Sequence, residues 1–462
     1  MARSLRRVAR PAEEFVREKF IAAWTRTDEI LAIVPAEEIL AKPIVWRHPV
    51  VFYVGHLPAF TWNQICGGIL KWQSLNPYFD DLFCRGVDPD VDTGECHWHP
   101  DVPDQWPSLS KILDYRDRVR EAVLESFAVL PRTGSDDVMT RDGRVYEMVL
   151  EHEYMHQETL LYMMRELPLT KVNRPQTARR YSFQPASPSC AVEIPAGAVH
   201  LGARFAELAF GWDNEFSQCE VDVPPFTIDS LPVTNGEFCQ FLESGAYEDE
   251  RFWRPEDWKW KRLTNTRHPN AWTLDNGSWL YRTLFDLIPL AQVTAWPVYV
   301  SLAEARAYAN WRGKRLPTEA EFHRAAYGGP DGGEARHPWG DADPEPRYGN
   351  FNFTAWSPVP VGSCPAGTSR WGVGELVGNG WEWTDTPFAP FPGFAPMASY
   401  PDYSKDFLDG KHFVLKGASW ATCADLMRPS FRNWYQAHYP YVFAKFRCVA
   451  EAAPSRRQRR LA

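Results

Sequence analysis

Residues 145–163 read VYEMVLEHEYMHQETLLYM, and their apolar and histidine positions recur every three or four residues. This repeat predicts an amphipathic helix with one buried face, and both His152 and His156 lie on that face. Because the two histidines are four residues apart, their imidazoles project from adjacent turns of the helix. The pair is typical either of a metal site or of two hydrogen-bonded core histidines.

Three further segments outside this stretch also have helical spacing. They cover residues 12–34, 50–72 and 108–130, the last with Ser108 as a helix N-cap, and the histidine helix itself extends over 143–167. Four such helices predict an up-and-down bundle, so we assign residues 12–172 to a helical domain. The connection 76–107 is longer than a bundle needs, which indicates either a functional loop or a domain-contact loop.

A third histidine favours the metal interpretation. His56 lies in the stretch GHLPAF (residues 55–60), one turn into the second predicted helix and at a matching depth. Three imidazoles on one side of a divalent ion leave three coordination positions open, which is the layout of oxygen-activating iron sites with a histidine in place of a carboxylate. Glu158 is expected on the opposite side of its helix. His48, His97 and His99 are expected on the surface or in loops.

The second half of the chain has a different pattern. Residues 173–191 carry three prolines and no helical period, as a linker would, and residues 192–450 form a second predicted domain. That domain is expected to be loop-rich, because the chain holds 39 Pro and 14% aromatic residues. The fold class is therefore α+β, with strands expected at 192–201, 218–228, 297–300 and 413–416, and helices at 234–243 and after the capping-box pair Thr318 and Glu321.

Composition restricts the class of partner. The 462 residues include 50 Lys and Arg against 59 Asp and Glu, a formal charge of −9 that gives no reason to expect nucleic acid. No apolar run approaches the roughly 20 residues that span a membrane, and the basic first ten residues are not followed by an apolar signal core. Nine Cys without CxxC spacing indicate reduced thiols in a cytoplasmic protein. Small-molecule substrates are therefore expected; the oligomeric state is left open.

Several motifs together resemble known families. Gly55–His56 and His152–Glu158 resemble the DinB-like metal bundle. Residues 192–450 are similar to the formylglycine-generating-enzyme/sulfatase-modifying domain, which has a C-type-lectin-like fold. The motifs are Pro232–Asn235, Arg315–Phe322, Gly378–Trp383 and Gly417–Trp420. Joined in this order, with Arg428–Trp434 near the end, the two halves resemble the sulfoxide synthases of the ergothioneine and ovothiol pathways over nearly the whole chain.

The resemblance implies a non-haem iron(II) oxygenase. Such an enzyme uses O2 to join a thiol sulfur, as a sulfoxide, to the imidazole of trimethylhistidine (hercynine). It makes Tyr400 the catalytic proton donor and Tyr403 a secondary donor, and it places Met155 where some relatives carry a Gln that contacts the imidazole. The other residues that it implies are His56, His152 and His156 as iron ligands, and Asn433 and Trp434 at the betaine end of the substrate.

The identity of the sulfur donor is inferred from two positions at which this sequence differs from some relatives. Relatives that use γ-glutamylcysteine carry Asp and Arg at the positions of Tyr435 and Tyr439. Two neutral phenols cannot pair with the γ-glutamyl amino and carboxylate groups, so free cysteine is favoured. Arg116 and Arg118 on the third predicted helix either hold the cysteine carboxylate or are exposed helix arginines.

Other functions remain open from the sequence. They are an ovothiol-type enzyme acting on histidine and cysteine, a selenoneine-type enzyme forming a C–Se bond, a zinc-dependent thiol transferase on the same ligands, and a non-catalytic binding module.

Overall fold

The computed structural model describes residues 13–84, 86, 90–94, 103–130, 137–178 and 181–452, which gather into two compact units. His97 and His99 lie outside the described residues. The helical unit comprises the described parts of Met1–Gln176 together with Ala203–Ser217 and Gly393–Asp406. The sheet unit comprises the described parts of Thr177–Gly202, Gln218–Pro392 and Phe407–Ala462. Each unit therefore combines stretches that are far apart in sequence, and the linker predicted at 173–191 stays a prediction.

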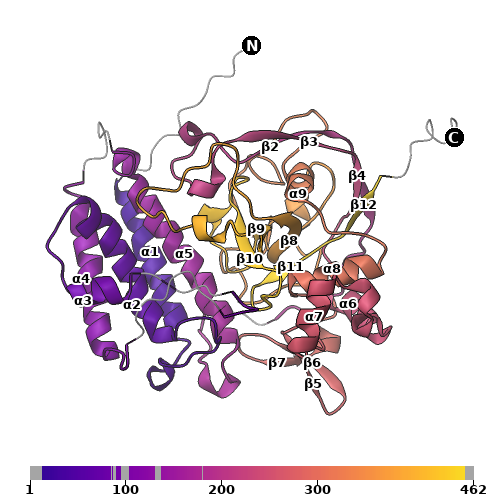
Figure 1. The fold of residues 1–462 in the computed structure, drawn as a ribbon, viewed down its shortest axis with the longest axis horizontal. Coiled ribbons are helices and arrows are strands. Elements are labelled where there is room, and N and C mark those ends of the chain that lie inside the picture. Colours follow the sequence, from indigo (N-terminus) through magenta and orange to yellow (C-terminus); the bar gives the residue numbers. More distant parts are fainter. Residues whose placement is uncertain are drawn as a thin grey trace. The chain divides into compact units, whose positions relative to one another are not determined.

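The predicted four-helix bundle is confirmed in the helical unit. α1 packs on α5, and α2 packs on both α4 and α5 (Figure 1). The helix predicted over 50–72 has two parts, because α2 continues as a π-helix over Trp62–Ile69. The long helices among the described residues are α1 (Glu13–Leu31), α2 (Val50–Thr61), α4 (Leu109–Ser126) and α5 (Arg144–Arg165).

α2 is the central helix of this bundle. All of its residues are buried, as expected for a helix that is apolar on every side. Pro58 lies inside α2 and has no N–H to donate, and the π-helix begins four residues later. Such π-turns are frequent beside functional sites. The irregular end of this helix therefore follows directly after the segment that carries His56.

A short helix lies in the connection that was predicted as loop. α3 (Pro77–Leu82) begins with the side chain of Asn76 accepting a hydrogen bond from the Phe79 backbone N–H at 3.2 Å. Pro77 occupies its first turn, where no N–H is needed. The interpretation of residues 76–107 as loop is therefore wrong at its start, and the Asn–Pro pair is the signal that predicts the helix.

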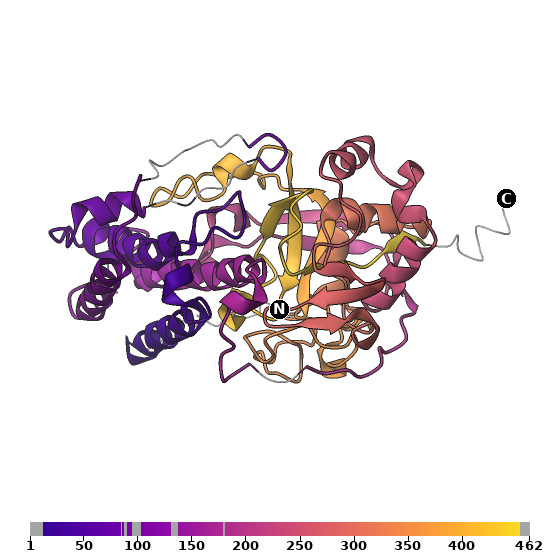
Figure 2. The ribbon, with the colours of Figure 1, turned by 90° about the horizontal axis from the view of Figure 1, so that it is seen from below.

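The sheet unit consists of small sheets joined by long loops. Its strand orders are β1-β4-β12, β10-β9-β8-β11, β2-β3 and β5-β6-β7. Figure 2 shows its short strands and the long connections among them, which agrees with the expected loop-rich α+β domain. Its main helices are α6 (Asn235–Glu243), α7 (Pro255–Leu263), α8 (Leu302–Trp311) and α9 (Glu319–Ala326). Its strands are β1 (Ala191–Ile194), β2 (Gly197–Leu201), β3 (Cys219–Val223), β4 (Phe226–Asp229), β5 (Trp272–Asp275), β6 (Ser278–Arg282), β7 (Leu287–Pro289), β8 (Gly380–Pro387), β9 (His412–Ala418), β10 (Asn433–Gln436), β11 (Ala444–Lys445) and β12 (Val449–Glu451).

Turn chemistry explains where the expected strands were right and wrong. The stretch 192–201 is two strands, β1 and β2, and 218–228 is β3 and β4, each pair separated by residues that include proline. The strand expected at 297–300 is wrong, because only an isolated bridge forms there, between Pro297 and Thr234. Proline has no N–H to donate to the hydrogen-bond ladder of a sheet.

The predicted capping box at the start of α9 is confirmed. The Thr318 hydroxyl accepts from the Glu321 N–H at 3.1 Å, and the Glu321 carboxylate accepts from the Thr318 N–H at 2.8 Å.

A buried ion cluster joins β8 to Lys445 and Arg447. The Glu382 carboxylate accepts from Lys445 Nζ at 2.8 Å and from Arg447 at 2.6 and 2.8 Å, and all three side chains are fully buried. Removing one partner of such a cluster leaves an unpaired buried charge. The Trp381–Trp383 motif thus has a structural role within the sheet unit.

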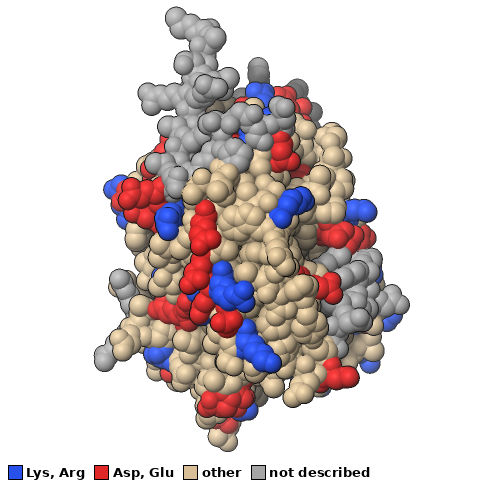
Figure 3. All heavy atoms as spheres, turned by 90° about the vertical axis from the view of Figure 1, so that its left-hand side faces the viewer, with Lys and Arg blue, Asp and Glu red and all other residues tan. Residues whose placement is uncertain are grey.

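Two surface properties bear on the kind of partner. None of the helices in the described part of the chain is long and apolar enough to cross a membrane. On the face drawn in Figure 3, acidic and basic side chains lie next to one another. Pairs of this kind within the helical unit include Arg120 with Asp28 at 2.7 Å and Arg26 with Glu29 at 2.5 Å.

Candidate metal centre

Three histidines converge inside the helical unit. His152 and His156 lie one turn apart on α5, and His56 lies on α2, which packs against α5. One ring nitrogen from each residue lies within 4.8 Å of the others. His56 is only 1% exposed and His152 only 3%. The geometry thus brings together the three residues that the sequence singled out as ligands.

A backbone carbonyl fixes the orientation of His56. Its Nδ1 lies 2.7 Å from the carbonyl oxygen of Phe83, the residue that follows α3. A carbonyl can only accept, so Nδ1 carries the proton and Nε2 keeps its lone pair. That Nε2 lies 3.2 Å from Nε2 of His156, on the inner side of the cluster. Metal-binding histidines usually have their second nitrogen held in this way.

Gly55 makes this bond possible. A Cβ at residue 55 would lie 2.5 Å from the Phe83 ring, closer than real Cβ contacts. The absence of a side chain lets Phe83 lie against α2 with its carbonyl next to the following residue, His56. Gly55 and His56 therefore act together: the glycine leaves room for Phe83, and the histidine bonds to the Phe83 carbonyl.

Burial keeps the three imidazoles neutral. It lowers the pKa of His56 to about 4, and it lowers the pKa of His152 and of His156 well below the ordinary value, with the neighbouring imidazoles adding to the effect. Within the described residues, Nε2 of His152 and Nδ1 of His156 have no hydrogen-bond partner. A bound divalent cation would satisfy such orphaned buried nitrogens, so the donor set fits a transition metal.

The segment Gly393–Asp406, here called the tyrosine segment, folds onto α5. The Tyr403 hydroxyl donates to the Met155 sulfur at 3.4 Å, and the Ser399 hydroxyl donates to the Met148 sulfur at 3.8 Å. The Gln64 side-chain amide also donates to the Ser399 carbonyl at 3.2 Å. Two thioethers of the histidine helix therefore anchor this segment, and Met155 is engaged by a predicted site residue.

Tyr400 is linked to the histidine cluster through Phe60. The Phe60 ring stacks on the His152 imidazole with centroids 3.6 Å apart and planes at 10°. The Tyr400 ring packs edge-on against the Phe60 ring, with centroids 5.2 Å apart, and its centroid lies 5.8 Å from that of the Tyr403 ring. Both predicted tyrosines thus belong to the same compact unit as the histidines.

The segment Ala203–Ser217, here called the supporting segment, holds the tyrosine segment. Trp212 stacks on Tyr403 with centroids 3.8 Å apart, and the Asp213 carboxylate accepts from the Ser404 hydroxyl at 2.6 Å. Arg144 of α5 donates to the Leu208 carbonyl at 3.0 Å. α5, the supporting segment and the tyrosine segment are therefore linked to one another by direct contacts.

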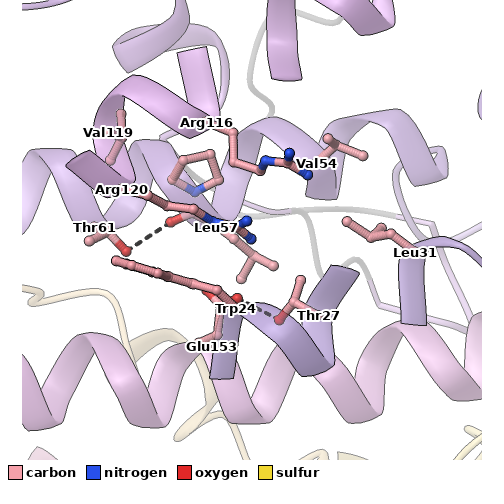
Figure 4. Close-up of a pocket in the computed structure, with 11 residues that line it drawn as sticks. Trp24, Thr27, Leu31, Val54, Leu57, Thr61, Arg116, Val119, Arg120 and Glu153 are labelled. Carbon is pink, nitrogen blue, oxygen red and sulfur yellow. Dashed lines mark hydrogen bonds between the residues drawn. The ribbon is translucent and has the colours of Figure 1, made fainter. Parts of the chain in front are cut away.

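The predicted arginines lie on α4. Arg116 is paired with Asp28 at 3.2 Å and with Asp117 at 2.8 Å, while Arg118 is exposed. Together with Arg120, Arg116 lines a cavity of about 10 Å³, which is room for roughly one water (Figure 4). Thr27 and Glu153 line the same cavity, and the Thr27 hydroxyl donates to Glu153 at 2.5 Å.

The remaining predicted residues lie in the sheet unit, on and after β10. The Asn433 side-chain oxygen accepts from the Trp434 N–H at 2.9 Å, and the Trp434 ring stacks on Phe388 at 4.4 Å. Tyr435 stacks on Tyr439 with centroids 5.3 Å apart and planes at 13°. These four residues form a second group, all from one short stretch of chain.

Three further contributors to the site, Phe60, Phe83 and Trp212, are not among the residues that the sequence predicts. Phe60 lies four residues after His56, so the helical repeat itself could have indicated it. The Phe83 carbonyl and Trp212 have no local sequence signal, because their roles depend on contacts between distant parts of the chain.

Comparison with known proteins agrees with both halves of the structure. Residues 19–160 match the DinB superfamily, and residues 178–452 match the sulfatase-modifying factor enzyme 1-like domain. The hercynine oxygenase of Mycolicibacterium thermoresistibile is 36% identical over 71% of this chain and 72% of its own length. That of Mycobacterium tuberculosis is 36% identical over 74% of this chain and 77% of its own. Ergothioneine biosynthesis protein 1 of Neurospora crassa is 31% identical over 93% of this chain, which spans 57% of that longer protein.

The bundle with its three histidines, followed by the sulfatase-modifying-factor domain, defines a two-domain class of protein. Within that class the relatives are specific, and the resemblance predicted from the motifs is confirmed. The chain belongs to the sulfoxide synthase family of ergothioneine biosynthesis, which includes the hercynine oxygenases.

Proposed function

We propose that the chain is an iron(II)- and O2-dependent sulfoxide synthase that joins a thiol sulfur to an imidazole carbon of hercynine. The observation that carries the proposal is the group of three neutral imidazoles within 4.8 Å, in one unit with Tyr400. The names of the relatives support hercynine as the acceptor. An oxygenase function also agrees with a donor set that leaves coordination positions open.

The overall reaction balances without an external reductant. A thiol loses its S–H bond and the imidazole loses one ring C–H bond, while a C–S bond and an S–O bond form. One oxygen atom of O2 enters the sulfoxide, and the other leaves as water with the two hydrogens. The four electrons that O2 accepts thus come from the two substrates.

In this proposal the histidines bind the metal and the tyrosines supply protons. His56, His152 and His156 would hold iron(II), which when bound supplies the redox chemistry with O2. Tyr400 donates a proton from a neutral hydroxyl, which carries no charge into an apolar site. Tyr403 is a secondary donor, because its hydroxyl is already directed to the Met155 sulfur.

The sheet unit supplies substrate recognition in this proposal. The Asn433 amide N–H group binds the hercynine carboxylate, and the Trp434 indole binds its trimethylammonium group. Cysteine is the proposed sulfur donor, because Tyr435 and Tyr439 stack as neutral rings where γ-glutamylcysteine-using relatives have charges. Arg116 is already paired with Asp28, which leaves Arg118 as the better candidate on α4 for the cysteine carboxylate.

The test is product analysis with a metal assay. Protein produced with ample iron is analysed for iron and zinc and then incubated with hercynine, O2 and cysteine, γ-glutamylcysteine or a selenium donor. We expect bound iron and a hercynine–cysteine sulfoxide in the mass spectrum, and a His56→Ala variant that lacks both. Bound iron without a C–S product from either thiol would reject the synthase proposal, whereas zinc with O2-independent thiol transfer would favour the transferase.

A further inference from the structure

α3 is too short to position His56 by itself. Helices of this length are not stable in isolation, because they form few internal hydrogen bonds for the entropy they cost. Yet the Phe83 carbonyl, immediately after Leu82, is the acceptor that fixes His56 Nδ1 at 2.7 Å. Something outside α3 must therefore hold it in place.

Asp80 is the anchor. Its carboxylate accepts one hydrogen bond from the Tyr115 hydroxyl at 2.6 Å and another from the Ser74 hydroxyl at 2.5 Å. Its backbone carbonyl accepts a third, from the Asn63 amide at 2.9 Å. One residue of α3 is thus tied to α4, to the preceding loop and to the π-helix that continues α2.

Tyr115 is the buried end of this anchor. It lies on α4 with only 2% of its surface exposed, and its ring packs edge-on against Phe79 at 5.4 Å. Hydrogen bonds between a buried phenol and a carboxylate are strong and directional. Tyr115 therefore sets both the distance and the rotation of α3 relative to α4.

We infer that Asp80 and Tyr115 are positioning residues for the metal centre, acting through α3 and the Phe83 carbonyl on the tautomer of His56. The inference rests on the proposed metal-binding function. When α3 is held, His56 keeps its proton on Nδ1 and offers the Nε2 lone pair. When α3 moves away, the bond to Phe83 is lost, and both tautomers and other ring orientations become populated. Loss of a partner of this kind typically weakens metal binding 10- to 100-fold.

The test compares two buried tyrosines of the same bundle. Tyr115→Phe removes the bond to Asp80 of α3. Tyr146→Phe removes a bond of similar burial, 2.9 Å long, to the hydroxyl of Ser126, the last residue of α4. Cobalt(II) is the probe, with affinity measured by chelator competition and geometry followed by its visible absorption. Nitrogen-15 spectra of the metal-free, histidine-labelled chain report the His56 tautomer.

We expect Tyr115→Phe to weaken cobalt binding at least tenfold, alter the cobalt spectrum and mix the His56 tautomers, with Tyr146→Phe close to the unaltered chain. Gly55→Ala should reproduce the effect, because its Cβ displaces Phe83 directly. An unchanged His56 tautomer in Tyr115→Phe, or equal losses in both tyrosine variants, would overturn the inference. Failure of the unaltered chain to bind cobalt would instead count against the metal centre, while the tautomer in the metal-free chain still decides the role of Tyr115.

Discussion

The Phe60 ring lies parallel to the His152 imidazole, with centroids 3.6 Å apart. His56 is oriented by a hydrogen bond to Phe83, but Nε2 of His152 has no hydrogen-bond partner in the described part of the chain. Stacking on Phe60 is therefore a principal restraint on the rotation of the His152 ring. It also connects the histidine cluster to Tyr400.

Phe60→Leu should weaken metal binding by about 3- to 10-fold, since an aromatic stack contributes roughly 0.5–1.5 kcal/mol beyond its buried area. Chelator competition with cobalt(II) measures the change. Phe20→Leu is the matched control, because Phe20 is equally buried and packs on Trp24, Phe127 and Tyr146. Equal losses in the two variants would mean that only general packing was disturbed.

Tyr400→Phe should retain the bound metal and slow sulfoxide formation by roughly 100-fold or more, the usual contribution of a positioned proton donor. Turnover should shift towards simple oxidation of the thiol. Mass spectrometry of both products gives their ratio, and Tyr403→Phe serves as the comparison. If the ratio in Tyr400→Phe equals that of the unaltered chain, Tyr400 does not donate the proton.

The preference for cysteine over γ-glutamylcysteine as sulfur donor can be tested by substitution. The unaltered chain should have a higher kcat/KM for cysteine than for γ-glutamylcysteine. The double variant Tyr435→Asp and Tyr439→Arg should reverse part of that preference, because it restores the two charges that the γ-glutamyl group can pair with. Competition between the two thiols in one reaction measures the ratio. A preference of the unaltered chain for γ-glutamylcysteine would show that other residues supply these charges.

A pH dependence of stability is expected from the sheet unit. Burial, with a contribution from Arg336, lowers the pKa of His337 to about 4, and its ring stacks on Trp339 at 4.7 Å. The unfolded chain keeps the ordinary value of about 6.5, so between pH 6.5 and 4 it binds a proton that the folded chain excludes. Stability should therefore fall as pH is lowered through this range.

His337→Phe keeps the stack and removes the proton. The urea midpoint of this variant should decrease less between pH 7 and pH 5 than that of the unaltered chain. Parallel curves for the two proteins would show that His337 does not titrate on unfolding in this range.

The sequence predicts best what depends on local spacing. The four helices and the shared face of His152 and His156 follow from a repeat of three to four residues, and His56 was found by its depth in the next helix. The capping box at Thr318 and Glu321 is equally local. These features need no knowledge of the rest of the fold.

Contacts between distant stretches could not be predicted in this way. The Phe83 carbonyl has no side-chain signature, and Trp212 contacts Tyr403 only because two later segments of the chain, Ala203–Ser217 and Gly393–Asp406, belong to the helical unit. The strand expected at 297–300 shows the opposite error: an apolar run indicates burial, but Pro297 allows only an isolated bridge. The placement of Tyr400 was accessible only through family resemblance.

The composition of the helical unit also has a consequence for the order in which the protein is made. Tyr400 follows His156 by 400 − 156 = 244 residues. At about 5–20 residues per second, a ribosome needs on the order of 12–50 s to add them. During this interval the three imidazoles have left the ribosome before the tyrosine segment exists. If the bundle folds and binds metal within this interval, the metal is held before the tyrosine segment has been made; this order follows from the chain positions of the histidines and Tyr400.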